Sequence, residues 1–246
     1  MEAMRIGWVL VVFAIAGAVK GITGMGLPTV AVSLLGLWMP PAQAAALLVL
    51  PSLATNVAQC RGRHLRPLAA RLWPGWVAIA IVTVCAPDLG GARADAARAW
   101  LGGVLACYGL WGLWRPRVPD LSACGRWTGA VAGAATCLVT AVTAVFVLPW
   151  VPYLQALRLE KDAMVQALGL SFTVATLALA VRLQASPQVA WGSVSWGMTV
   201  CGALAGAFAG LGLGEVLRGR LAGQAFQKAL SLVFIGLGAA NLVRAG

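Results

Sequence analysis

The sequence predicts an all-α polytopic membrane protein built from two repeats. Hydrophobic residues make up 61% of the chain and charged residues only 10%, and the mean hydropathy is +0.87, which is far outside the range of soluble domains. The apolar residues fall into segments separated by charged residues, proline or glycine, and these segments form two sets with the same order of lengths. We therefore expect a single transmembrane domain over residues 1–246, with repeats over about 1–115 and 126–246.

Each set contains five apolar segments. They run over 6–20, 27–38, 41–60, 72–87 and 97–114, then over 127–147, 149–157, 163–181, 189–213 and 224–243. The first two segments of each set together span roughly 33 residues, which is too long for one crossing of about 20 residues and too short for two. Each repeat is therefore predicted to be a broken or re-entrant helix pair followed by three transmembrane helices.

The basic residues favour inverted repeats over parallel ones. An offset of 120 residues aligns the halves over 23–56, pairing Thr23 with Thr143. Inversion leaves five basic residues on one side, keeps Lys20 in the membrane, and gathers 12 on the other side: Arg61, Arg63, Arg66, Arg71, Arg115, Arg117, Arg126, Arg158, Lys161, Arg218, Arg220 and Lys228. Parallel repeats would divide them ten to seven. Because basic residues gather in cytoplasmic loops, both termini are predicted outside.

Lys20 is a cation between an apolar stretch, 6–19, and a glycine-broken one, 21–28. A charge near the middle of a membrane segment is costly and usually faces a cavity, a partner or a substrate. Glycines at 21, 24 and 26 are predicted to let the backbone leave the helix, and Pro28 suits the start of the next one. Unpaired N–H groups from Gly24 to Leu27 would then bind an anion, with Thr23 adding a hydroxyl and Met25 lying in the same turn. The alternative is that Lys20 snorkels to the interface and the glycines permit close helix packing.

The second half contains a counterpart of this site without its charge. Thr140, Thr143 and Pro149 remain, but the stretch from 140 to 150 has no glycine and no basic residue. Lys20 therefore corresponds to Thr140, and we expect the anion to be held asymmetrically. The competing interpretation is that both threonines bond carbonyls of their own helix.

A neutral polar stripe follows Pro51. Its members fall at spacings of three, one and three, so they share one face of a helix: Ser52, Thr55, Asn56 and Gln59. The counterpart helix presents Gln166, Ser171, Thr173 and Thr176. Such a stripe suits an oxyanion that must bind and leave, and interhelical hydrogen bonding is the alternative. Glycines also recur every fourth residue at 202, 206, 210 and 214, which predicts a close contact between two helices.

The titratable residues predict neither a metal nor another cofactor. The six cysteines include no C-x-x-C pair, and His64 is the only histidine. All seven acidic residues fall in or beside predicted loops: Glu2, Asp88, Asp95, Asp120, Glu160, Asp162 and Glu215. A proton relay of carboxylates in the middle of the membrane is therefore not expected. The net charge of +11 is assigned to the loops of a membrane protein and not to nucleic-acid binding.

The chain resembles the sulfite exporter TauE/SafE family of small anion permeases. Residues 17–26 resemble its first G-x-x-x-G-x-T-G-x-G signature, and the likeness continues over 145–157, Lys161-Asp162 and 166–173. The second signature differs, because Thr140 and Ala144 stand in place of the usual glycines. The resemblance implies transport of sulfite, thiosulfate, sulfonates or related organic anions across a bacterial inner membrane.

We therefore expect a secondary transporter, an exporter, of a small anion in the lipid bilayer, working by alternating access at a midplane site between the repeats. The expected substrate-binding residues are Lys20, Thr23, Gly24, Met25, Gly26, Ser52, Asn56, Thr140, Thr143, Ser171 and Thr173. Coupling to Na+ or H+, and assembly as a homodimer, stay open. The alternatives are a carrier of an uncharged solute, a non-transporting structural or assembly subunit, and a membrane enzyme, for which the sequence offers no catalytic constellation.

Overall fold

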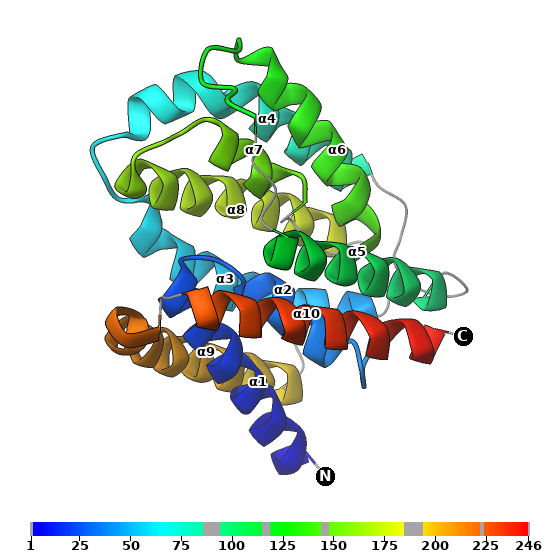
Figure 1. Cartoon of the computed structure of the whole chain (residues 1–246). Coiled ribbons are helices and arrows are strands. Elements are labelled where there is room, and N and C mark those ends of the chain that lie inside the picture. The colour runs from blue at the N-terminus through cyan, green and yellow to red at the C-terminus, as the bar shows by residue number, and fades with distance from the viewer. Residues whose placement is uncertain are drawn as a thin grey trace.

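The regular elements are helices throughout the part of the chain that the computed structural model describes, which is residues 2–85, 94–114, 119–143, 148–184, 194–221 and 224–245. This confirms the all-α prediction (Figure 1). The helices are α1 (Glu2–Thr23), α2 (Leu27–Leu35), α3 (Pro41–Cys60), α4 (Leu65–Cys85), α5 (Ala94–Trp114), α6 (Trp127–Thr143), α7 (Trp150–Ala156), α8 (Lys161–Gln184), α9 (Val194–Leu221) and α10 (Gln224–Ala245). Every predicted apolar segment corresponds to one of them.

Several helices are longer than the apolar segments that predicted them. α1 has 22 residues and is long enough to cross a bilayer alone, as are α4, α8 and α9. α4 begins seven residues before the predicted 72, and α9 continues eight residues beyond the predicted 213. The differences arise because a helix continues through charged residues at its ends, whose long side chains reach water from an apolar stem. A boundary placed at the first charged residue therefore makes the predicted helix too short.

The pair α1 and α2 returns to the end of the molecule where it began. The Trp8 ring lies 5.6 Å from the Trp38 ring, centroid to centroid, although one belongs to the start of α1 and the other follows α2. Arg244, in the last turn of α10, donates to the carbonyl of Leu37. The start of α1, the end of α2 and the end of α10 therefore lie together, and we call this the terminal end.

The pair α6 and α7 also returns on itself. The N–H of Leu121, before α6, donates to the carbonyl of Ala156 in the last turn of α7, at 2.9 Å. A Cβ on Gly129, in the first turn of α6, would lie 3.0 Å from the hydroxyl of Tyr153 in α7. Residues 144–147, at the predicted break, lie outside the described ranges.

Helices α3 and α8 cross in opposite directions. The hydroxyls of Ser52 in α3 and Thr176 in α8 lie 3.2 Å apart. At the end of α3, the carbonyl of Cys60 accepts a hydrogen bond from the Gln166 side chain, near the start of α8. α3 thus begins near the terminal end, whereas α8 begins at the opposite one. We call that opposite end the basic end, because it carries Arg61, Arg63, Arg158 and Arg218.

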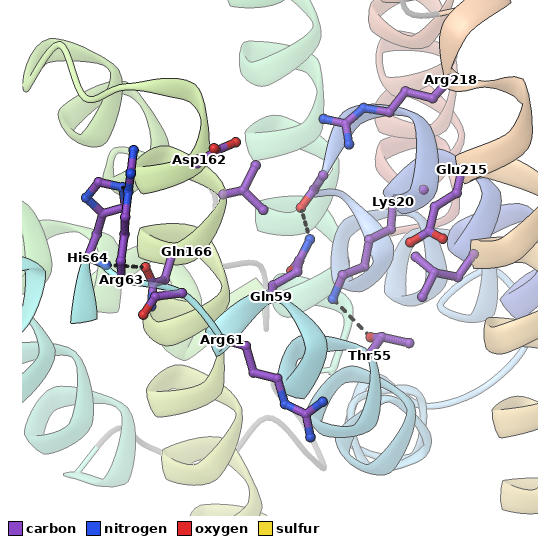
Figure 2. Close-up of a pocket in the computed structure, with 15 residues that line it drawn as sticks. Lys20, Thr55, Gln59, Arg61, Arg63, His64, Asp162, Gln166, Glu215 and Arg218 are labelled. Carbon is purple, nitrogen blue, oxygen red and sulfur yellow. Dashed lines mark hydrogen bonds between the residues drawn. The ribbon is translucent and has the colours of Figure 1, made fainter.

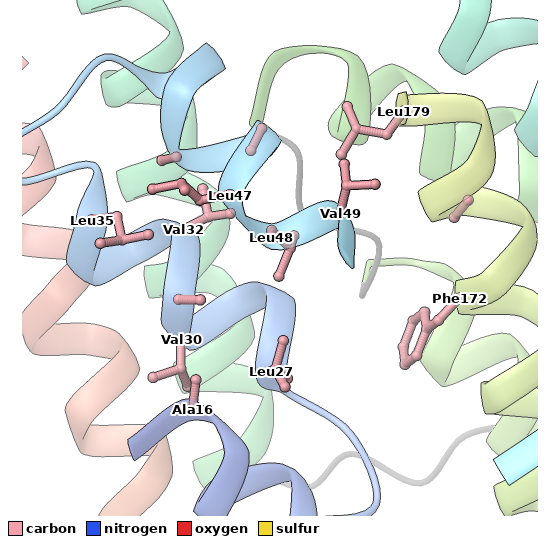
Figure 3. Close-up of a cluster of buried hydrophobic side chains, with 14 of the residues drawn as sticks. Ala16, Leu27, Val30, Val32, Leu35, Leu47, Leu48, Val49, Phe172 and Leu179 are labelled. Atoms are coloured by element: carbon pink, nitrogen blue, oxygen red, sulfur yellow. The ribbon is translucent and has the colours of Figure 1, made fainter. Parts of the chain in front are cut away.

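The core lies where α2 is enclosed by its neighbours. Its described side chains are apolar around most of the circumference, and eight of its nine residues are buried, which is typical of a helix with no solvent-facing side. Figure 3 shows Leu27, Val30 and Leu35 of α2 near Leu47 and Leu48 of α3, all of which are buried. This packing fixes the start of α2, and hence the break that precedes it.

The glycine stripe of α9 packs against α1, as predicted. A Cβ on Gly206, Gly210 or Gly214 would overlap the carbonyl oxygen of Leu10, Ala14 or Ala18 in α1. From the other side, a Cβ on Gly21 would lie 2.5 Å from the carbonyl oxygen of Leu211. The two helices run in the same direction with their backbones in contact, as small residues permit.

Candidate functional site

The break between α1 and α2 is made by Gly24 and Gly26. Their φ angles are +81° and +100°, values that L side chains rarely adopt. Gly26 is the N-cap residue of α2, and Pro28 lies in its first turn. The prediction that Gly21 also leaves the helix is wrong, because α1 continues to Thr23. Gly21 instead provides the close contact with α9.

Thr23 closes this turn with its own hydroxyl. Its Oγ1 lies 2.8 Å from the carbonyl oxygen of Val19 and 2.7 Å from that of Met25, and it accepts from the Met25 N–H at 3.2 Å. The Gly24 N–H donates to the carbonyl of Lys20 at 2.7 Å. Two of the N–H groups that were predicted to hold the anion are therefore bonded within the chain in this structure.

Lys20 points into the protein. Its side chain is only 2% exposed, so it does not snorkel in this structure. The ammonium group donates to Thr55 Oγ1 at 2.9 Å and to Asn56 Oδ1, both on α3, and Figure 2 shows the Lys20 and Thr55 pair. Both acceptors are neutral, and no ion pair with Lys20 is found among the described residues. An ammonium group has three donors, so one is left for a ligand once the bonds to described residues are counted.

A chain of buried hydrogen bonds leads from Lys20 to α8. Asn56 accepts from Lys20 and donates from Nδ2 to Ser52 Oγ at 3.4 Å. Ser52 Oγ in turn lies 3.2 Å from Thr176 Oγ1. These bonds join α1, α3 and α8 through side chains that are each 2% exposed or less, and they match the alternative of interhelical hydrogen bonding.

Lys20 lines a pocket with a volume of about 700 Å³. Its buried wall includes Lys20 and Thr55, whereas Arg61, Arg63, Asp162 and Glu215 are exposed. The lining residues are Lys20, Gly21, Gly24, Thr55, Gln59, Arg61, Gly62, Arg63, His64, Asp162, Val165, Gln166, Leu211, Glu215 and Arg218 (Figure 2). Within the described ranges, no group of three or more His, Cys, Asp or Glu side chains is arranged to hold a metal ion.

Gln59 and the break share one wall of this pocket. Gln59 Nε2 donates to the carbonyl of Gly24 at 2.8 Å, so the end of α3 is tied to the turn between α1 and α2. Gln59 Oε1 is buried and has no hydrogen-bond partner in the described residues. This oxygen is thus an acceptor for a ligand that carries a donor group.

Ser171 and Thr173 were predicted site residues, but they do not line the pocket. Ser171 Oγ donates to Ala167 O at 2.6 Å and accepts from Trp76 Nε1 at 2.9 Å, which joins α4 to α8. Thr173 Oγ1 bonds Gly169 O at 2.7 Å and lies 3.4 Å from Cys60 Sγ. These contacts match the helix-bridging alternative. Thr140 and Thr143 belong to α6, but their side chains lie outside the described part.

The charged mouth of the pocket was not predicted. Arg61, Arg63 and Asp162 were assigned to loops, and Glu215 and Arg218 were placed beyond the end of a helix. Glu215 differs from the expectation for acidic residues, because it lies within α9 and lines the same pocket as Lys20. The signal that could have found it is the glycine stripe, whose spacing requires α9 to remain helical at least to Gly214.

Gln166 braces the segment that joins α3 to α4. Its Nε2 donates to Cys60 O at 2.9 Å and to Gly62 O at 3.1 Å, and its Oε1 accepts from the His64 N–H at 3.1 Å. We expect Gln166→Ala to lower the free energy of unfolding by about 2 kcal/mol, since it leaves three backbone groups without partners. Thermal unfolding in detergent measures this. Gln184→Ala, an exposed glutamine on the same helix, is the control, and equal losses in both variants would contradict the bracing role.

Comparison with known proteins identifies a family for nearly the whole chain. A family model described as Sulfite exporter TauE/SafE matches residues 9–241, a range that contains every pocket residue. Comparisons with curated proteins and with solved structures gave no match.

Proposed function

Because the chain belongs to the sulfite exporter TauE/SafE family, we propose that it exports a small anion, such as sulfite, thiosulfate, a sulfonate or an organic acid, through the pocket at Lys20. One observation carries the proposal: a buried ammonium group, bonded only to neutral acceptors in the described residues, lines a pocket that reaches the basic end. A buried charge without a counter-charge is costly, and an anion in the pocket would supply that charge.

The charges at the mouth suit an anion that arrives from water. Arg61 and Arg63 are exposed and Arg218 is half-buried where they line the pocket, and these three arginines outnumber the carboxylates of Asp162 and Glu215. An excess of positive charge at a cleft raises the local concentration of anions. Deeper in the pocket the attraction to Lys20 is stronger, because a charge pair interacts more strongly where water is excluded. Polar groups of Thr55 and Gln59 line the same wall.

We also propose that residues 1–115 and 126–246 form inverted repeats. Each starts with a helix pair that returns on itself, and α3 and α8 begin at opposite ends. The packing of α1 on α9 has its counterpart in α4 and α6, where a Cβ on Gly75 would lie 2.7 Å from the carbonyl oxygen of Gly129. Alternating access between such repeats is a recurring plan of secondary transporters.

The positive-inside rule places the basic end in the cytoplasm, which we take to be that of a bacterium, with the protein in its inner membrane. In this orientation the pocket opens toward the cytoplasm, as an exporter requires for loading. Assembly as a homodimer stays a prediction, which native mass measurement would test.

Labelling of single cysteines tests the orientation. Arg5→Cys and Arg63→Cys, both at exposed positions, would be made in a variant whose six cysteines are replaced by serine. A membrane-impermeant thiol reagent is expected to reach Arg63→Cys only from the cytoplasmic face and Arg5→Cys only from the opposite face. Labelling of both from the same face would contradict the proposed topology.

Flux through proteoliposomes tests the function itself. Vesicles are loaded separately with sulfite, thiosulfate, methanesulfonate, acetate and, as an uncharged solute, glycerol, and efflux is followed with and without Na+ and pH gradients. We expect protein-dependent efflux of at least one sulfur oxyanion or carboxylate and none of glycerol. Dependence on a gradient identifies the coupling ion. Efflux of glycerol alone would favour the carrier of an uncharged solute, and no flux at all would favour a non-transporting subunit.

A further inference from the structure

A carboxylate on α9 lines the pocket beside the helix that carries Lys20. Glu215 is exposed and makes no ion pair among the described residues, but its backbone touches α1 at the residue next to Lys20, since a Cβ on Gly21 would lie 2.8 Å from the Glu215 nitrogen. Figure 2 shows the Glu215 and Lys20 side chains together at one wall of the pocket. The ammonium group is at present directed to Thr55 and Asn56 on the opposite side.

An exporter that has released its anion outside must change back to its inward-open conformation with an empty binding site. During that change Lys20 would have no counter-charge. The Thr55 hydroxyl and the Asn56 amide, which accept its hydrogen bonds, are neutral and do not cancel its charge. An isolated buried charge is strongly unfavourable, whereas a paired one is tolerated. A carboxylate that can reach the ammonium group removes this barrier.

Resting on the proposed function, we propose that Glu215 is an internal counter-anion, which pairs with Lys20 when the transported anion has left and is displaced when the next anion binds. Glu215 then has two effects. It competes with the anion for Lys20, which weakens binding, and it neutralises the empty site, which speeds its return.

The packing of α1 on α9 explains why this role falls to Glu215. Glycines bring the two backbones into contact at Gly206, Gly210 and Gly214, so the proposed role has α1 and α9 moving together with Glu215 beside Lys20. Asp162 is the other carboxylate of the pocket, but it lies in the first turn of α8, which packs on α3 and α4 and whose helix dipole already stabilises its charge.

The remaining titratable side chains at the pocket carry no negative charge. Arg218 follows Glu215 by three residues on α9, and Arg61, Arg63 and His64 face the pocket from the segment between α3 and α4. Side chains three residues apart on a helix are neighbours, so Arg218 can pair with the Glu215 carboxylate. The carboxylate therefore has a partner after a bound anion has displaced it from Lys20. None of these groups can replace Glu215 as a counter-charge for an ammonium group.

Comparison of net efflux with exchange tests this role. The assay uses whichever of sulfite, thiosulfate, methanesulfonate and acetate gives the highest flux with the wild-type protein. In Glu215→Gln we expect anion affinity to rise and net efflux into anion-free buffer to fall, each by roughly tenfold, because the empty site returns with an unpaired charge. Exchange, in which a labelled anion inside is replaced by the same anion outside, should keep its wild-type rate, since the loaded site is neutral in both directions.

Asp162→Asn is the matched control, because it removes the same charge from the mouth of the same pocket. It is expected to leave the ratio of net efflux to exchange unchanged. Equal losses of efflux and exchange in Glu215→Gln, or the same change of ratio in Asp162→Asn, would overturn the inference while leaving the proposed function standing. If instead Lys20→Gln transports the anion normally, the proposed role of Lys20 fails, and the inference fails with it.

Discussion

Lys20→Gln is expected to reduce anion flux by roughly a hundredfold or more, which corresponds to about 3 kcal/mol of lost interaction with the buried charge. The substitution keeps a side chain that can donate to Thr55 and Asn56, so the change is mainly one of charge. The loss should appear in both net efflux and exchange, because the anion has lost its principal partner in each. Proteoliposome flux with each of the anions named above measures it.

The unfolding temperature distinguishes a loss of anion binding in Lys20→Gln from a loss of folded protein. A buried ammonium group bonded only to neutral acceptors destabilises a fold, so Lys20→Gln is expected to unfold at the same temperature as the wild-type protein or at a higher one. Lys228→Gln removes a charge at an exposed position of α10 and should transport normally. Unchanged flux in Lys20→Gln would refute the charge role, and low flux together with a lowered unfolding temperature would assign the loss to folding.

The helices and the first break could be predicted because their signals are local. Gly24, Gly26 and Pro28 mark the end of α1 and the start of α2, and the positive φ angles of the two glycines bear this out. The start of α4 and the end of α9 were misplaced, since hydropathy falls at Arg71 and at Glu215 although the backbone stays helical there. The prediction of inverted repeats rested on counts of basic residues. The contact between Trp8 and Trp38, which shows that α1 and α2 return to one end, could not be predicted from the sequence.

The candidate site could be predicted in part for the same reason. Lys20 and Asn56 were identified because a charge and an amide stand out in apolar segments, but their direct hydrogen bond depends on where the fold places α1 relative to α3. The mouth brings together Arg61, Asp162 and Glu215, which are far apart in sequence. Nothing in their local sequence distinguishes them from ordinary charges at helix ends.

Gly210→Leu is expected to prevent α1 and α9 from packing and to cost about 3 kcal/mol or more, at the upper end of what overpacking does. A Cβ at this position already overlaps the carbonyl oxygen of Ala14 and would lie 2.7 Å from its carbonyl carbon. Both atoms belong to the backbone, so no side chain can rotate away to make room. The helices must separate, and the contacts at Gly206 and Gly214 are lost with them.

The bilayer makes this loss hard to recover. Lipid tails are as apolar as the separated helix faces, so no hydrophobic force drives the two helices back together. Gly212→Leu is the matched control, because a Cβ there meets nothing within 4 Å. We expect Gly210→Leu to lower both the unfolding temperature and the monodisperse fraction in detergent, and Gly212→Leu to leave both unchanged. Equal behaviour of the two variants would contradict the close contact, and with it the argument that Lys20 and Glu215 move as one unit.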